Sequence, residues 1–181
     1  MSLTLRPGTA DDAPEVSAYH NRSLSLYAKL GFVVREPLAT MQGPPLRQTI
    51  PGHTVRPATL ADVEACNRLC MDVHGFHRGG ELAVGIQHGS ARVVERAGRI
   101  TGCASAVGFF GYATGESNDD IKALLAAAPN FQGPGFLLPM RNAGLLRWCL
   151  EHGLLIVHMD TLMSVGLYNQ PQGAFLPSIG F

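Results

Sequence analysis

A ten-residue phrase near the start of the chain returns fifty residues later, and this repetition constrains the fold more than any other feature. Residues 3–12 read LTLRPGTADD and residues 53–62 read HTVRPATLAD, with Thr, Arg, Pro, Thr and Asp at matching positions. Each phrase joins a short strand-like segment to a Thr-x-x-Asp capping pattern, which typically opens a helix. Each copy of such a repeat marks one structural unit. The chain therefore contains two copies of one plan.

The endings of the two copies also match, but the copies differ greatly in length. Asn21 is followed by Leu-Gly-Phe at residues 30–32, and Asn169 by Ile-Gly-Phe at residues 179–181. The first copy passes almost directly from its capping pattern to Asn21, whereas the second has a long middle section. Too little of the first copy remains to bury a core alone. We expect three parts: a remnant of a first copy, a linker and a nearly complete second domain, at residues 1–45, 46–54 and 55–181.

Composition places the chain among well-buried globular proteins. Apolar residues make up 46% and charged residues 15% of the 181 residues, which argues against disorder. The net charge is zero and no Lys/Arg cluster stands out, so we expect no nucleic-acid partner and no membrane partner. The aliphatic run at residues 154–157 is too short to span a bilayer, and no secretory signal is visible. The four cysteines do not have the spacing of a disulfide framework, so we expect them to be reduced thiols. This predicts a cytoplasmic protein.

The segment NRSLSLYAKLGF, residues 21–32, predicts a short amphipathic helix. Asn21 stands at the front, where a side-chain oxygen can accept from an unpaired backbone N–H. Gly31 follows the last turn, where a left-handed conformation is wanted and glycine adopts it without strain. Apolar side chains recur at the i, i+3 and i+4 spacing of one helical face: Leu24, Tyr27 and Ala28.

The same string resembles the closing segment of the GCN5-related N-acetyltransferases, the GNAT superfamily. Proteins of that family carry an Asn and then a helix ending in Leu-Tyr-x-x-x-Gly-Phe beside the acetyl-CoA thioester. The resemblance implies that Asn21 contacts the pantetheine arm and that Tyr27 is the general acid for the departing thiolate, a role that requires hydrogen-bond reach. The alternative is a tyrosine that packs its ring and leaves its hydroxyl at the rim. The corresponding stretch of the second copy, residues 175–178, has no tyrosine.

The GNAT resemblance also implies a pyrophosphate loop of the form Gln/Arg-x-x-Gly-x-Gly/Ala at the start of a helix. A helix N-terminus offers free N–H groups and a partial positive charge to a phosphate. Residues 132–137, QGPGFL, are rich in glycine, but Pro134 removes a donor. Residues 141–146, RNAGLL, open a helix directly but end in a bulky leucine. An ordinary capped helix and turn remain the alternative, and the residues we expect to bind the cofactor here are Arg141, Asn142, Ala143 and Gly144.

The second copy is expected to alternate strands and helices. In the first copy we expect a helix after Asp12, with a proline in its first turn. In the second copy we expect Asn118 to cap a helix that ends at Pro129. A hairpin turns around residues 97–98. Other expected elements are a helix from Thr59 to about Val73, a helix from Arg141 to His152, and strands at 33–41, 91–95, 99–110 and 154–163. This order matches the GNAT resemblance and predicts an α/β fold, with a mixed, partly parallel sheet flanked by helices on both faces.

A group of cysteines and histidines between residues 66 and 77 has the composition of a metal site. Cys66, Cys70 and His74 have i, i+4, i+8 spacing, and His77 follows. Two Cys and two His form a zinc ligand set. However, these four residues come from one stretch of the chain, and no other segment of the sequence supplies a second pair of ligands to complete a site. Buried cysteines behave as small hydrophobic residues, so we expect no metal. The two histidines are expected in solvated loops, with the lining of an acceptor pocket as the alternative.

The resemblance implies acetyl transfer from acetyl-CoA, as co-substrate, to an amine of a small molecule or peptide, by direct attack in a ternary complex. The alternative is a non-catalytic GNAT-like module that binds a ligand or assembles. The apolar strand expected at residues 154–163 lacks a partner in its own copy, and such edges recruit strands. We therefore expect residues 33–41 to pair with it, either within the chain or by exchange in a homodimer.

Overall fold

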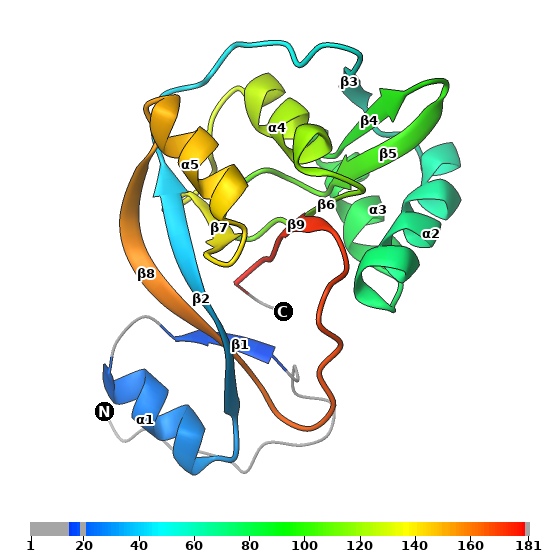
Figure 1. Ribbon diagram of the computed structural model, residues 1–181. Helices are drawn as coiled ribbons and strands as arrows, with labels where there is room; N and C mark the ends of the chain where they lie inside the picture. The colour runs from blue at the N-terminus through cyan, green and yellow to red at the C-terminus, as the bar shows by residue number, and fades with distance from the viewer. Residues whose placement is uncertain (1–14, 19–20, 180–181) are drawn as a thin grey trace.

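The computed structural model describes residues 15–18 and 21–179, and its strands form two sheets (Figure 1). The first sheet has the order β1-β8-β2-β7. The second has the order β3-β4-β5-β6-β9. The strands are β1 Glu15–Ala18, β2 Val33–Gln42, β3 Thr54–Pro57, β4 Arg92–Arg96, β5 Arg99–Ala104, β6 Ala113–Gly115, β7 Phe136–Pro139, β8 Leu155–Ser164 and β9 Ala174–Leu176.

The helices cover both faces of the second sheet. One hydrophobic cluster joins α2 and α3 to Val93 and Cys103, whereas another joins α4 to Val94 and Ala104. Successive side chains of a strand point to opposite faces, so the two clusters lie on opposite sides. The helices are α1 Asn21–Lys29, α2 Val63–His74, α3 Gly79–Gln87, α4 Asn118–Ala127 and α5 Ala143–Glu151, and a short 3₁₀ turn, Leu60–Asp62, precedes α2. The predicted α/β class is confirmed. The strand ladders are antiparallel, and an isolated bridge between Gly108 and Gln132 is parallel.

The strand β2 holds the first sheet together. It runs antiparallel to β8, from Val33 opposite Ser164 to Gln42 opposite Leu155, and its second half pairs with β7 on the other side. The pairing expected between residues 33–41 and 154–163 is therefore confirmed within one chain; exchange between two chains stays a prediction. Since β2 ends at Gln42, the N-terminal part of the chain supplies an interior strand to a sheet whose β7 and β8 come from the C-terminal part.

One expectation about this sheet is wrong. The helix predicted after Asp12 would cover residues 15–18, but these form β1, which pairs with residues 161–164 of β8; residues 1–14 lie outside the described part. A ladder to a distant strand overrides the local capping signal. The apolar strand β8 is buried over only part of its length, since Leu155–Met159 are exposed and only its second half is covered.

The second sheet opens with a well-defined hairpin and a capping box. Ala97 and Gly98, with φ of 52° and 76°, form the turn between β4 and β5, as the sequence predicts. Arg56 on β3 donates two hydrogen bonds of 2.8 Å to the carboxylate of Asp62. The same carboxylate accepts a hydrogen bond from the backbone N–H of Thr59, which completes the capping box. These bonds hold the pKa of Asp62 well below its usual range. The capping box predicted at the start of the second copy is confirmed.

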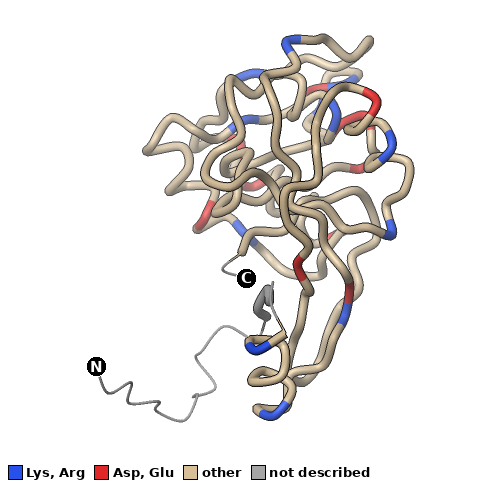
Figure 2. Tube along the Cα trace, turned by 90° about the vertical axis from the view of Figure 1, so that its left-hand side faces the viewer, with Lys and Arg blue, Asp and Glu red and all other residues tan. Residues whose placement is uncertain are grey.

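Charged residues are mixed over the described surface. Figure 2 shows Lys/Arg and Asp/Glu positions interspersed along the described trace, as the zero net charge leads one to expect. None of the helices found in residues 15–18 and 21–179 combines the length and apolar character needed to cross a membrane.

Candidate functional site

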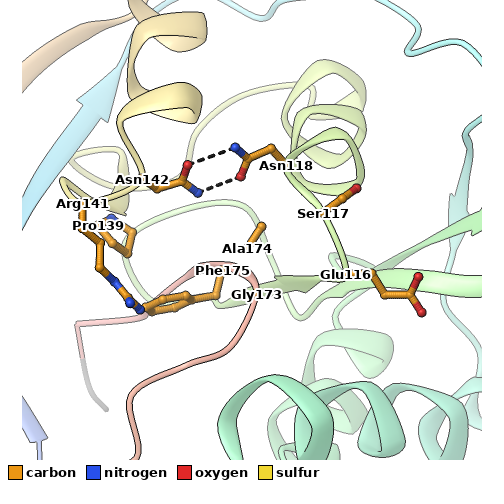
Figure 3. A pocket seen from close by; sticks show the side chains of 9 residues that line it. All are labelled: Glu116, Ser117, Asn118, Pro139, Arg141, Asn142, Gly173, Ala174 and Phe175. Atoms are coloured by element: carbon orange, nitrogen blue, oxygen red, sulfur yellow. Dashed lines mark hydrogen bonds between the residues drawn. The ribbon is translucent and has the colours of Figure 1, made fainter.

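A cleft of about 400 Å³ lies where the two sheets separate, at the starts of α4 and α5 (Figure 3). The strand β6 leads into α4, and β7 leads into α5, so both helix N-termini reach the same space. The strand β9 runs along the floor and pairs with β6. The lining residues are Glu116, Ser117, Asn118, Pro139, Arg141, Asn142, Gly173, Ala174 and Phe175.

Two asparagines link the helices across this cleft. Asn118 donates to Asn142 at 3.0 Å and Asn142 donates back to Asn118 at 2.7 Å (Figure 3). The Asn142 side chain also accepts from the backbone N–H of Leu145 at 3.2 Å and so caps α5. The sequence predicted that the helix would begin at Arg141; it begins at Ala143, because Asn142 takes the capping position. One N-terminal donor of α5 is thus already paired.

The start of α4 carries its own negative charge. Ser117, rather than the predicted Asn118, is the N-cap, and its hydroxyl donates to Asp120 at 2.7 Å. Asp119 and Asp120 lie in the first turn, and Glu116 stands just before it. Carboxylates at a helix N-terminus offset the positive end of its dipole. Of the two helix starts, the one at α5 is therefore better suited to a phosphate.

Arg141 is the basic residue that lines the cleft, and its charge is partly engaged. Its Nε lies 2.9 Å from Oε2 of Glu36, a buried residue of β2. Its guanidinium also donates to the carbonyl of Pro171 and lies 5.6 Å from the ring centre of Phe175. Burial raises the pKa of Glu36, and Arg141 opposes that rise. About a third of the Arg141 side chain remains exposed to solvent, so it can still meet an anion in the cleft.

Comparison with solved structures identifies the architecture. A candidate acetyltransferase from Pyrococcus horikoshii superposes with a TM-score of 0.68 and 14% identity, over 87% of this chain and 54% of that one. A GNAT-family acetyltransferase from Colwellia psychrerythraea superposes with a TM-score of 0.50 and 10% identity, over 84% and 64%. The chain has the GNAT fold. It spans only about half to two thirds of the length of these two proteins. No protein-family model and no curated protein matches it.

The GNAT fold does not gather every residue that the sequence singled out. Arg141 and Asn142 line the cleft, whereas Ala143 and Gly144 form the exposed first turn of α5 outside its lining. The other glycine-rich candidate is structural. Its Gly133 carbonyl accepts from Gln42 at 3.3 Å, and β7 rather than a helix follows. The sequence did not predict that residues 116–118 and 173–175 line the cleft. The only signal for residues 116–118 is that they begin a second helix, and residues 173–175 are far from them in the sequence.

Asn21 and Tyr27 both lie on α1, and neither lines the cleft. Tyr27 belongs to the C-terminal cap of that helix. The N–H of Phe32 bonds to the Tyr27 carbonyl and that of Gly31 bonds to the Ala28 carbonyl, with φ of 92° at Gly31. This is a Schellman motif, which usually brings together the residues flanking the cap. The Tyr27 and Phe32 rings accordingly meet at 5.5 Å.

The cysteines and histidines of α2 are packed into the core. Cys66, Cys70 and His74 are buried, and His74 hydrogen-bonds to Thr114 at 3.0 Å. Burial lowers the pKa of His74 to about 3, and the positive charge of Arg78 adds to this. In the part of the chain that the structure describes, no three His, Cys, Asp or Glu side chains are placed to hold a metal. His77 is exposed on the loop before α3.

Proposed function

We propose that this protein binds acetyl-CoA in the cleft between α4 and α5 and transfers the acetyl group to an amine. The observation that carries the proposal is a GNAT fold with an arginine-bearing cleft at the N-terminus of α5. Free N–H groups and the helix dipole attract a pyrophosphate there, and Arg141 adds a charge that can hydrogen-bond to it. The amine belongs to a small molecule or a peptide.

The proposed reaction is a direct transfer. The neutral amine nitrogen attacks the thioester carbonyl carbon, the C–S bond breaks, and the acetyl group forms an amide with the acceptor. The nitrogen loses a proton and the departing thiolate gains one, so the products are an acetylated amine and CoA. Tyr27 is proposed as the donor of the latter proton, which requires the substrate complex to bring its hydroxyl within about 3 Å of the sulfur.

A second candidate function is a non-catalytic module that binds a ligand or assembles with another chain. Two observations favour it. Tyr27 packs against Phe32 in a helix cap and is absent from the lining of the cleft. Arg141 is paired with the buried Glu36, so part of its charge is already used.

Calorimetry and thermal denaturation with acetyl-CoA test the cleft. A ligand at a hundred times its Kd adds about 2.7 kcal/mol to the free energy of unfolding. For a domain of this size that raises Tm by about 5–11 °C. We expect Arg141→Gln to weaken binding by about 10-fold or more, because a hydrogen bond to a charged group is lost. Arg147→Gln, an exposed change on the same helix, is the matched control. Equal affinities of both variants and the native chain would remove this cleft from consideration.

Catalysis is tested separately at Tyr27. If Tyr27 is the general acid, Tyr27→Phe lowers turnover by about 10²–10⁴-fold and leaves the affinity for acetyl-CoA unchanged. The substitution keeps the ring that packs on Phe32, so folding is preserved. A Phe variant with full activity would reduce Tyr27 to its capping role. Binding without any turnover over a panel of amines would support the non-catalytic module.

A further inference from the structure

A second cavity, of about 240 Å³, lies on the sheet of β2 and β8. Its polar wall comes from three neighbouring side chains, Thr40 on β2 and His158 and Asp160 on β8. Thr40 stands opposite His158 in the ladder, and Asp160 is two residues further along the same strand. Phe109 and Pro134 supply the apolar wall, and the cavity shares no lining residue with the cleft at α4 and α5.

The carboxylate of Asp160 is buried, and no basic side chain of the described residues serves as its counter-cation. The residue is 3% exposed, and Thr40, which is fully buried, donates to its Oδ2 at 2.5 Å. Within residues 15–18 and 21–179, no other side chain hydrogen-bonds to Asp160 and no basic side chain pairs with it. A buried carboxylate is costly unless paired and fully hydrogen-bonded. Its second oxygen, Oδ1, is therefore available to a donor that enters the cavity.

The walls of the cavity are fixed by the backbone around Phe109. The Phe109 N–H donates to the carbonyl of Gln132 at 3.1 Å, and the Phe109 carbonyl accepts from the N–H of Ile179 at 2.9 Å. These bonds connect the loop of Phe109 to the segment before β7 and to the C-terminal segment. The aromatic wall thus stands beside the carboxylate before any ligand arrives, and preformed walls of this kind favour binding.

We propose that this cavity binds the ammonium group of a small organic cation. The ammonium supplies both the missing charge and the donor for Oδ1 of Asp160, and an aromatic wall such as Phe109 favours a cation. A bare metal ion fits less well, because hard cations take six or more oxygen ligands and this cavity offers one carboxylate. The volume is below the range of about 300–1,000 Å³ typical of drug-sized ligands, so the ligand is small and partly apolar. The proposal does not rest on acetyl transfer.

Titration calorimetry on the full chain without acetyl-CoA tests the proposal, with benzylammonium as the probe. Benzyl alcohol and benzoate keep the ring and replace the ammonium by a neutral or an anionic group. We expect saturable binding of benzylammonium with a Kd of about 1 mM or tighter. The alcohol should bind at least about tenfold more weakly, and benzoate not at all. No saturable heat from benzylammonium, or equal affinity for the alcohol, would overturn the proposal.

Two variants locate the bound cation. Asp160→Asn keeps the shape and removes the charge, and it should weaken benzylammonium binding by about tenfold or more. Asp72→Asn removes the same charge from the exposed surface of α2 and should change nothing. Phe109→Leu keeps the wall apolar, removes the ring, and should cause a smaller loss. If Asp72→Asn and Asp160→Asn weaken binding equally, the attraction is a general charge effect and the assigned site is wrong.

Discussion

Truncating Leu38 should show how far the protein depends on the strand supplied by its N-terminal part. Leu38 is fully buried on β2 and packs in one cluster with Leu137 of β7 and Leu162 of β8. It stands opposite Pro139 on one side and Asp160 on the other. Leu38→Ala removes the contact that links three strands of the sheet, and it leaves the backbone ladder unchanged.

The expected loss follows from the burial of this side chain. Replacing a fully buried leucine by alanine costs about 2–5 kcal/mol, the lost transfer free energy plus the cavity left behind. In a chain of this length each kcal/mol lowers Tm by about 2–4 °C. Leu38→Ala should therefore lower Tm by about 4–20 °C. That is a large part of the 5–15 kcal/mol by which whole domains are stable.

Val34→Ala is the matched control, because Val34 lies on the same strand with 53% of its surface exposed. An exposed substitution changes the free energy of unfolding by about 0.5 kcal/mol or less. Thermal melts followed by circular dichroism, and urea titrations at one temperature, measure both variants. The urea midpoint of Leu38→Ala should fall while the slope m stays the same. If the two variants lose the same small amount of stability, β2 is not the central strand of a packed sheet.

Two further predictions concern the same fold. Residues 46–181 expressed alone lack β2, so β7 and β8 lose their common partner, and we expect this fragment to aggregate or unfold; a folded monomer with the Tm of the whole chain would contradict this. Burial lowers the pKa of His74 to about 3 in the folded protein, whereas in the unfolded chain this histidine is protonated below about pH 6.5. Below that pH the unfolded state binds more protons than the folded state. The free energy of unfolding should therefore be highest above pH 6.5 and decrease as the pH falls toward 3. In His74→Gln that slope should be weaker between pH 6.5 and 4, measured as Tm against pH; an unchanged slope would mean that His74 is not the group responsible.

Local chemistry was enough to predict the parts of the fold that depend on neighbouring residues. The cap at Gly31 follows from a residue type that tolerates positive φ. The capping box of Thr59 and Asp62 follows from a spacing of three residues. The pairing of β2 with β8 could be predicted for a different reason: each strand lacked a partner in its own copy, and backbone groups must be paired.

Side-chain contacts between residues far apart in the sequence could not be predicted. The sequence gives no sign that Glu36 lies against Arg141, because the two residues meet only after β2 enters the sheet. The same holds for the cavity of Thr40 and Asp160, whose residues come from opposite ends of the chain. The helix α3 was missed because Gly79 and Gly80 open it and lower its intrinsic propensity. The start of α5 was misplaced by two residues, since the capping role of Asn142 depends on its conformation.

Because β2 is an interior strand, it must wait during synthesis until the strands on both of its sides have been translated. The strand leaves the ribosome early, but its partner β8 is complete only at Ser164, roughly 120 residues later at about 5–20 residues per second. For about 6–24 seconds the nascent strand therefore has an unpaired backbone and unsheltered apolar side chains. Chaperones, or a finished β8 from a neighbouring ribosome on the same message, can capture it in that interval. If two chains exchange this strand, as the sequence predicts, we expect slow translation and dense polysomes to favour the exchanged form and fast translation to favour the closed single chain.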